Sequence, residues 1–193
     1  MIERSLILMK PDAVQRGIVG EILARFERAG LKVIGAKLIQ ATDELAESHY
    51  PTTDEWFEKV GRNTIEDSEK YGIDLQENIG ATEPIEIGKL VKQWTKDFLT
   101  SGPVLALVLE GVHAVERVRS LVGPTVPVLA PPGTIRGDFS LDSAIAANRR
   151  SRAIYNLIHA SGSVEEASKE IDLWFKSDEL LSYKRTHEDL YKY

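Results

Sequence analysis

Short apolar runs at four places along the chain predict four β-strands. They cover residues 5–9, 31–39, 104–109 and 154–158. Each run has the length of a strand and is rich in Leu, Ile or Val. Residues 104–109 form the most apolar run of the chain, so we expect this strand to lie at the centre of a sheet.

Between these runs, apolar residues recur three and four positions apart, which predicts helices at residues 19–29, 42–50, 113–122 and 163–175. Residues 51–100 form a longer helical stretch with breaks at glycines. Its last helix has one apolar face, made by Ile87, Leu90, Val91, Trp94 and Phe98. This order of elements predicts an α+β protein with the ferredoxin-like split βαβ arrangement, in which surrounding helices cover a four-stranded antiparallel sheet.

Composition narrows the class of protein. The chain has 193 residues, of which 42% are hydrophobic and 28% charged, as is ordinary for one globular domain. Its net charge of −6 argues against a sequence-independent nucleic-acid binder. The chain has no cysteine, which excludes disulfides and thiolate sites. No run approaches the roughly 18 apolar residues of a membrane span, and the first apolar run is too short for a signal peptide, so we expect a cytoplasmic protein.

The chain lacks the two familiar glycine-rich phosphate loops, so side chains would have to hold any phosphate group. Neither Gly-x-x-x-x-Gly-Lys-Ser/Thr nor Gly-x-Gly-x-x-Gly is present. Lys10 ends the first predicted strand, and Arg136 lies in a loop rich in Pro and Gly, residues 123–137. The planar guanidinium group suits phosphate oxygens, and long irregular loops are usually functional. We therefore consider both cations as candidate phosphate contacts, with a solvated surface lysine as the alternative for Lys10.

Among the four histidines, His159 has the position best suited to chemistry. It ends a predicted strand just before a helix N-terminus, where main-chain N–H groups favour anions. Asn156 and Ser161 flank it with neutral donors. A neutral imidazole there can attack phosphorus and carry the phosphoryl group as a covalent intermediate. Glu170 would reach the far ring nitrogen and fix the tautomer if its helix folds back; a surface or core histidine is the alternative interpretation.

Other kinds of site have little support. No two histidines lie three or four residues apart and no Asp-x-Asp-x-Asp-Gly loop is present, so we expect no metal held by the protein itself. Asp138 and Asp142 lie four residues apart, but surface or capping roles suit them better. The Gly-x-Ser-x-Gly elbow of a hydrolase is absent. Aromatic residues make up 7% and do not alternate with basic runs, which disfavours a single-strand stacking platform.

Four motifs resemble, in the same order, those of the nucleoside diphosphate kinase family. They are residues 6–17 (LILMKPDAVQRG), 101–103 (SGP), 132–139 (PGTIRGDF) and 156–161 (NLIHAS), with LWF at 173–175 as a further match. The resemblance implies a ferredoxin-like oligomeric enzyme, a homohexamer or homotetramer. It would transfer the γ-phosphoryl of ATP or another nucleoside triphosphate to a nucleoside diphosphate by a ping-pong route through phosphohistidine, with Mg²⁺ carried by the nucleotide.

The same resemblance implies roles for individual residues. His159 corresponds to the phosphorylated histidine, and Tyr50 to the tyrosine beside it. Ser161 and Glu170 correspond to the residues that orient the histidine. The phosphate and ribose contacts would be Lys10, Arg119, Thr125, Arg136 and Asn156.

The chain also departs from the common form of the family. Residues 51–95 and 140–152 are enlarged, as in some archaeal members, which implies two insertions within one domain spanning residues 1–193. The aromatic residue that caps the base has no clear counterpart, and Trp94 or Val91 are the candidates. Gly162 stands where an acidic residue is usual, which puts the indirect hold on Mg²⁺ in doubt.

Two other classes of function compete with this interpretation. The first is a non-enzymatic nucleotide-binding regulator or scaffold on the same fold; His159, retained with Lys10 and Arg136, argues against it because binding alone needs no nucleophile. The second is a single-stranded nucleic-acid binder that uses the arginines at 149, 150 and 152. A steep loss of oligonucleotide binding with added salt would favour that second function.

Overall fold

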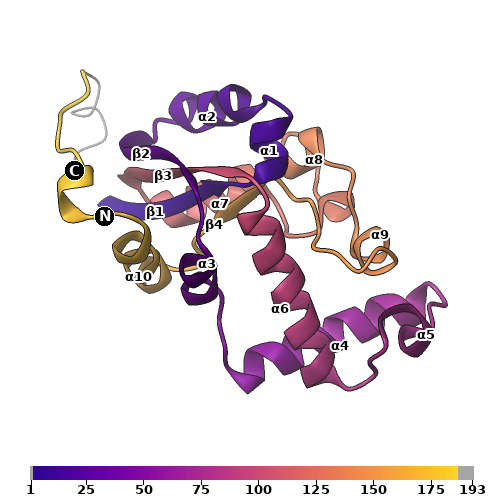
Figure 1. The fold of residues 1–193 in the computed structure, drawn as a ribbon. Coiled ribbons are helices and arrows are strands. Elements are labelled where there is room, and N and C mark those ends of the chain that lie inside the picture. The colour runs from indigo at the N-terminus through magenta and orange to yellow at the C-terminus, as the bar shows by residue number, and fades with distance from the viewer. Residues whose placement is uncertain (1, 187–193) are drawn as a thin grey trace.

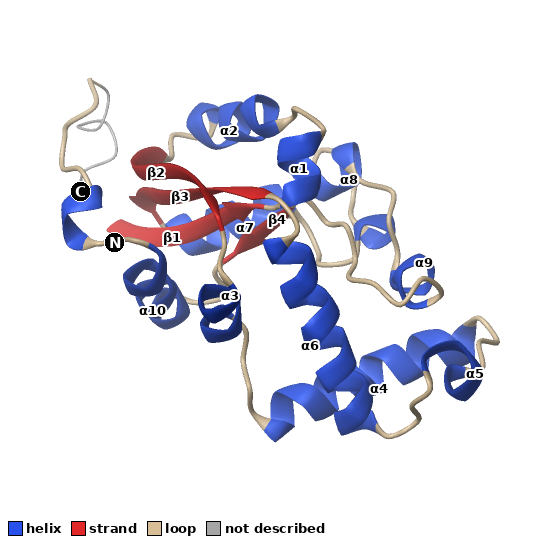
Figure 2. Cartoon of the chain, viewed as in Figure 1, coloured by secondary structure: helices blue, strands red, loops and turns tan. Residues whose placement is uncertain are grey.

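The computed structural model describes residues 2–186 and contains a four-stranded antiparallel sheet. The strands are β1 (Ile2–Met9), β2 (Lys32–Gln40), β3 (Pro103–Val112) and β4 (Ile158–Ala160), in the order β2-β3-β1-β4. This is the predicted ferredoxin-like order, and β3 lies at the centre beside β1, as its apolar run predicts (Figure 2). The charged C-terminal segment, residues 177–193, is described up to residue 186.

Helices cover both faces of the sheet, because successive side chains of β1 point to opposite sides. Leu6 and Leu8 pack with α3 (Asp43–His49) and α10 (Val164–Trp174), whereas Ile7 and Met9 pack with α2 (Val19–Arg28) and α7 (Ala114–Val122). All four β1 side chains are fully buried. Figure 1 shows α2 on one side of the sheet and α3 and α10 on the other.

The enlarged middle connection forms a helical lobe that projects away from the sheet (Figure 1). It consists of α4 (Asp54–Lys70), α5 (Leu75–Ile79) and α6 (Pro84–Thr100). Helices α4 and α6 cross closely at Gly61 and Gly88, where a Cβ atom would overlap the main chain of Pro84 or Phe57. The Asn78 side chain of α5 donates to the Asn148 carbonyl of α9 (Ala144–Asn148) at 2.7 Å, which ties the lobe to the second enlarged segment.

The remaining elements are short. They are α1 (Pro11–Gln15), α8 (Ile135–Phe139) and two 3₁₀ turns, η1 (Pro127–Leu129) and η2 (Ser177–Glu179). The end of the described chain lies along β2, since the Leu181 N–H donates to the Ile34 carbonyl at 2.7 Å. None of the described helices is long and apolar enough to cross a membrane.

Two local predictions are corrected by the structure. The fourth strand is Ile158–Ala160 and not residues 154–158, because Leu157 adopts a left-handed conformation with φ 69° that a strand cannot continue through. His159 therefore lies inside the strand and not beyond its end. The loop 123–137 is also not wholly irregular, since η1 and the start of α8 lie within it.

Candidate active site

Strand pairing brings the two key motifs together. His159 lies opposite Leu8 in the register of β4 and β1, and Lys10 directly follows β1. The Lys10 N–H donates to the Leu157 carbonyl at 2.8 Å, and the Lys10 ammonium donates to Asn156 Oδ1, also at 2.8 Å. Residues 10 and 156–159, far apart in the sequence, thus share one end of the sheet.

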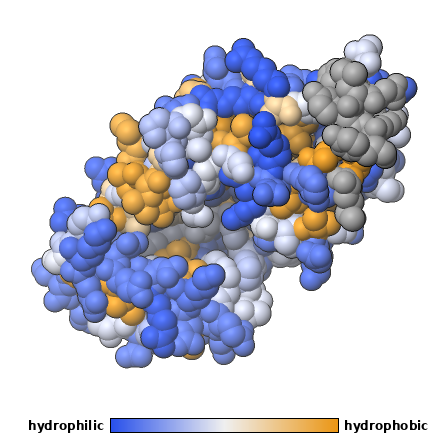
Figure 3. All heavy atoms as spheres, turned by 180° about the vertical axis from the view of Figure 1, so that it is seen from behind, coloured by the Kyte–Doolittle hydropathy of each residue, from blue (hydrophilic) through white to orange (hydrophobic). Residues whose placement is uncertain are grey.

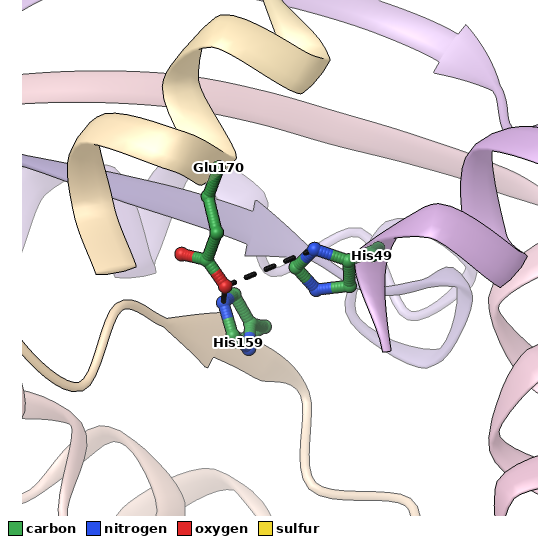
Figure 4. Close-up of side chains that lie close together, drawn as sticks. All are labelled: His49, His159 and Glu170. Atoms are coloured by element: carbon green, nitrogen blue, oxygen red, sulfur yellow. Dashed lines mark ion pairs between the residues drawn. The ribbon is translucent and has the colours of Figure 1, made fainter. Parts of the chain in front are cut away.

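The carboxylate of Glu170 lies next to the imidazole ring of His159, as the sequence predicts (Figure 4). Glu170 Oε1 on α10 lies 2.7 Å from His159 Nε2. The ring is turned so that Nε2 makes no well-aligned hydrogen bond among the described residues; such contacts often align only once substrate is bound. The Ser161 hydroxyl donates to the other oxygen of Glu170 at 2.6 Å. The carboxylate favours the proton on Nε2, which leaves the lone pair on Nδ1.

His159 is neutral at physiological pH. Burial and then the charge of Lys10 lower its pKa to about 3, whereas Glu166 opposes the shift. The side chain nevertheless keeps 20% of its surface accessible while Nε2 is buried. Only an unprotonated ring nitrogen has a lone pair for attack, so this environment is compatible with a nucleophilic His159.

A second histidine, His49, was not anticipated as part of this cluster. Its ring packs edge-on against that of His159, with centroids 4.5 Å apart and planes at 83°. The indole of Trp174 donates to His49 Nδ1 at 3.3 Å. Burial lowers the pKa of His49 to about 3, so two neutral rings lie in contact. The only clue in the sequence is that His49 directly precedes Tyr50, because 110 residues separate the two histidines.

Lys10 has one positively and one negatively charged neighbour, Arg136 and Asp12, which shift its pKa in opposite directions. Burial and then the charge of Arg136 lower the pKa of Lys10 to about 8, while Asp12 acts in the opposite direction. The Asp12 carboxylate accepts the main-chain N–H groups of Ala13 and Leu157, each at 3.0 Å. These contacts fix the loop before β4 against the end of β1 and hold Lys10 beside Asn156.

Arg136 is a cation that also connects two segments of the chain through hydrogen bonds. Its guanidinium donates to the carbonyls of Asn156 at 3.1 Å, Gly123 at 2.9 Å and Ile158 at 2.6 Å. Three of its five N–H groups are thereby used, and two remain for another acceptor. Burial and the charge of Arg119 lower the pKa of Arg136 to about 10, so it stays charged at neutral pH.

A cavity of about 750 Å³ opens in front of His159, a volume typical of small-molecule sites. Figure 3 shows the molecule hollowed between the body that carries the sheet and the lobe of α4 and α5. Most predicted site residues line this cavity: Lys10, Tyr50, Val91, Trp94, Arg119, Thr125, Arg136, Asn156 and His159. Ser161 and Glu170 do not line it, and lie behind the histidine ring instead.

Several polar groups of the cavity lie at its histidine end. Arg119 is exposed and lines the cavity, and the Thr125 carbonyl accepts the Asn156 side-chain amide at 3.0 Å. The Tyr50 hydroxyl is buried and has no hydrogen-bond partner among the described residues. Burial raises the pKa of Tyr50, so its hydroxyl keeps its proton and can donate. The arrangement suits a ligand that brings several anionic oxygens to His159.

Comparison with known proteins shows which family the chain belongs to. The model of the family "Nucleoside diphosphate kinase" matches residues 3–63 and 88–180. The chain is 47% identical to a nucleoside diphosphate kinase of Pyrobaculum aerophilum, over 93% of this chain and 98% of that relative. The chain belongs to the nucleoside diphosphate kinase family. It is therefore an enzyme that transfers phosphoryl groups between nucleotides, and the non-enzymatic alternative is not favoured.

Solved structures of nucleoside diphosphate kinases have the same fold. The enzyme from Pyrobaculum aerophilum superposes with a TM-score of 0.91 at 45% identity, covering 94% of this chain and 100% of that one. The enzyme from Borrelia burgdorferi, solved as a transition-state mimic with bound vanadate and ADP, has a TM-score of 0.76 at 36% identity, covering 97% and 95%. A third, from Halobacterium salinarum in complex with CDP, has a TM-score of 0.71 at 32% identity over the full length of both chains.

An acidic residue that the sequence motifs did not indicate, Glu166, lies close to Gly162. Gly162 lies where the family resemblance implies an acidic residue, and Glu166, four residues later in α10, lines the same cavity. Glu166 Oε2 accepts the Gly162 N–H at 2.9 Å. An acidic group is thus present at the histidine end of the cavity although position 162 has none.

Proposed function

We propose that this nucleoside diphosphate kinase works by double displacement at His159. The Nδ1 lone pair attacks the γ-phosphorus of a nucleoside triphosphate, the bond from that phosphorus to the bridging oxygen breaks, and the nucleoside diphosphate leaves. A terminal oxygen of the acceptor diphosphate then attacks the phosphohistidine, and the Nδ1–P bond breaks. The observation that supports this route is the neutral ring of His159, with Nε2 against Glu170 and the cavity in front of it.

The cations around His159 would stabilise the transferring group. Charge spreads over the equatorial oxygens of a phosphoryl group in the transition state, so positioning and fixed positive charge provide most of the catalysis. We assign this role to Lys10, Arg119 and Arg136, which all line the cavity. Asn156 and Thr125 would contact ribose or phosphate oxygens. The Tyr50 hydroxyl, which has no partner within residues 2–186, would be available as a donor.

Mg²⁺ would enter with the nucleotide, without a dedicated protein site. It prefers oxygen ligands and usually keeps several waters. The cluster of His49, His159 and Glu170 offers two nitrogens among its three donor atoms, which does not suit Mg²⁺. Glu166 is the carboxylate that lines the histidine end of the cavity, and we assign to it the indirect hold that Gly162 cannot supply. The bound ion would neutralise charge on the β- and γ-phosphates.

Assembly and location are also part of the proposal. We infer one domain spanning residues 1–193, with insertions at about 51–95 and 140–152, assembled as a homohexamer or homotetramer in the cytoplasm. The exposed apolar side chains of Val128 and Leu129, 60% and 69% accessible in the loop 123–137, support a subunit contact there. Sedimentation analysis distinguishes the two assemblies from a monomer.

Initial-velocity kinetics test the proposed route. A double displacement gives parallel lines in double-reciprocal plots when ATP and GDP are varied together, because the first product leaves before the second substrate binds. The enzyme should also exchange label between ADP and ATP without any second nucleotide. Intersecting lines, with no exchange, would show direct transfer in a ternary complex and would exclude the phosphohistidine route.

A further inference from the structure

The cavity extends from His159 along helix α4, which forms one of its walls. The family model matches only the first part of this helix. Residues 64–87 lie outside the match to the family model. Yet residues of α4 on both sides of that boundary line the cavity, in a stripe made by Trp56, Val60, Asn63, Thr64 and Asp67. Steps of three and four residues place them along one face of the helix.

This wall is fixed in place by packing. Gly61 and Gly88 allow α4 and α6 to approach each other main chain to main chain, and the contact between Asn78 and Asn148 holds the far side of the lobe. Two cavity-lining side chains of α6, Val91 and Trp94, add to the apolar surface of Trp56 and Val60. Such side chains pack against the faces of a nucleobase, which leaves the hydrogen-bonding edge of the base to polar neighbours.

Two polar side chains of this stripe have no partner in the part of the chain that the structure describes. The side chains of Asn63 and Asp67 take part in no hydrogen bond or ion pair within residues 2–186, whereas the Thr64 hydroxyl donates to the Val60 carbonyl at 3.0 Å. Asp67 is half-buried. The arginine that lines the cavity nearby in the second enlarged segment, Arg152, is already paired with Asp142 at 2.6 Å.

The charge distribution in the cavity decides which part of a nucleotide meets Asp67. The cations at the histidine end attract phosphates, whereas a carboxylate repels them. The base would therefore lie toward the stripe. A carboxylate only accepts hydrogen bonds. Guanine presents two adjacent donors on its Watson–Crick edge, the ring N1–H and the 2-amino group. Adenine and cytosine each present a ring-nitrogen lone pair beside the amino group, which opposes a carboxylate.

We propose that Asp67, assisted by Asn63, contacts the edge of the nucleobase and biases this enzyme toward guanine nucleotides. The inference rests on the proposed function, because it requires the phosphates to lie at His159. The bias is a difference between affinities, produced both by the two hydrogen bonds to guanine and by the unfavourable contact with adenine. The inserted helix would thus provide base discrimination that the phosphate contacts cannot supply.

Binding of GDP and ADP, measured by calorimetry on the full chain, tests this inference. Asp67→Asn should reduce the ratio of the Kd for ADP to the Kd for GDP by about tenfold, the order expected for charged hydrogen bonds. IDP keeps N1–H but lacks the 2-amino group, so it should bind the original protein with a Kd between those of GDP and ADP. Glu66→Gln removes the same charge from an exposed neighbour outside the cavity and should leave the ratio unchanged.

A ratio that stays within about twofold of the original value in Asp67→Asn would overturn the inference. Asp67→Ala provides a second variant, with the same expected direction. Because these are binding measurements, they are independent of phosphoryl transfer. Failure of the proposed function would be seen instead as an enzyme that binds nucleotides but shows no label on histidine.

Discussion

Oε1 of Glu170 lies 2.7 Å from Nε2 of His159, and the second oxygen of the same carboxylate accepts the Ser161 hydroxyl at 2.6 Å. Strand β4 and helix α10, which follow each other in the chain, hold this pair in contact. The carboxylate sits behind the ring, and the cavity lies in front. We therefore expect Glu170 to act through His159 as a positioning residue.

Replacing Glu170 by Gln should slow phosphoryl transfer without preventing nucleotide binding. The variant loses the negative charge that keeps the proton on Nε2, and we expect kcat to fall about ten- to a hundredfold, the range for a lost charged hydrogen bond, with KM little changed. Steady-state kinetics measure both values. Asp172→Asn, an exposed position on the same helix, is the matched control. A fall in KM and kcat together, or no change in either, would contradict the positioning role.

The rate should fall on the alkaline side of neutrality because Lys10 loses its proton there. Its pKa is lowered to about 8, and a lysine is charged only below its pKa. We expect kcat/KM to be constant between about pH 6 and 7 and then to decline by up to about tenfold per unit above pH 8. Lys10→Arg keeps its charge at these pH values and should move the decline to higher pH. The same alkaline decline in Lys10→Arg would assign it to another group.

Arg136 should prove necessary for stability as well as for catalysis. Arg136→Ala removes one donor from each of three carbonyls, of which the Asn156 carbonyl still accepts the Ile158 N–H. Each buried group that is left unpaired costs about 1–3 kcal/mol. We expect a lower free energy of unfolding and a kcat/KM reduced by about a hundredfold. Arg136→Lys, which retains charge but cannot span three acceptors, should recover part of the rate and less of the stability. Chemical denaturation with parallel kinetics separates the two effects, and an Arg136→Ala variant of unchanged stability would contradict the structural role.

The sequence predicted the parts of the fold that depend on local patterning. The order of strands and helices follows from periodicity, and β3 is central because its run is apolar throughout. The boundary of β4 was missed because a left-handed residue, Leu157, interrupts an otherwise strand-like run. No local pattern marks such a conformation in a residue other than glycine, since tertiary contacts impose it.

The sequence predicted the site residues that lie in short motifs. It did not predict the contacts between segments that are far apart in the chain. Lys10, Arg136, Asn156 and His159 lie in recognisable segments and line one cavity. His49 reaches His159 only through the packing of α3 against α10. The cavity wall made by α4 likewise depends on how closely α4 crosses α6, which no single segment reveals.

Trapping the covalent intermediate tests the central claim most directly. The enzyme is incubated with γ-labelled ATP in the absence of an acceptor, and acid-labile, base-stable label on the protein is measured before and after addition of GDP. We expect His159 to carry the label, GDP to remove it, and His159→Ala to abolish both events, whereas His113→Ala, which changes an exposed histidine, should behave like the original enzyme. Label and transfer that persist in His159→Ala would contradict the account.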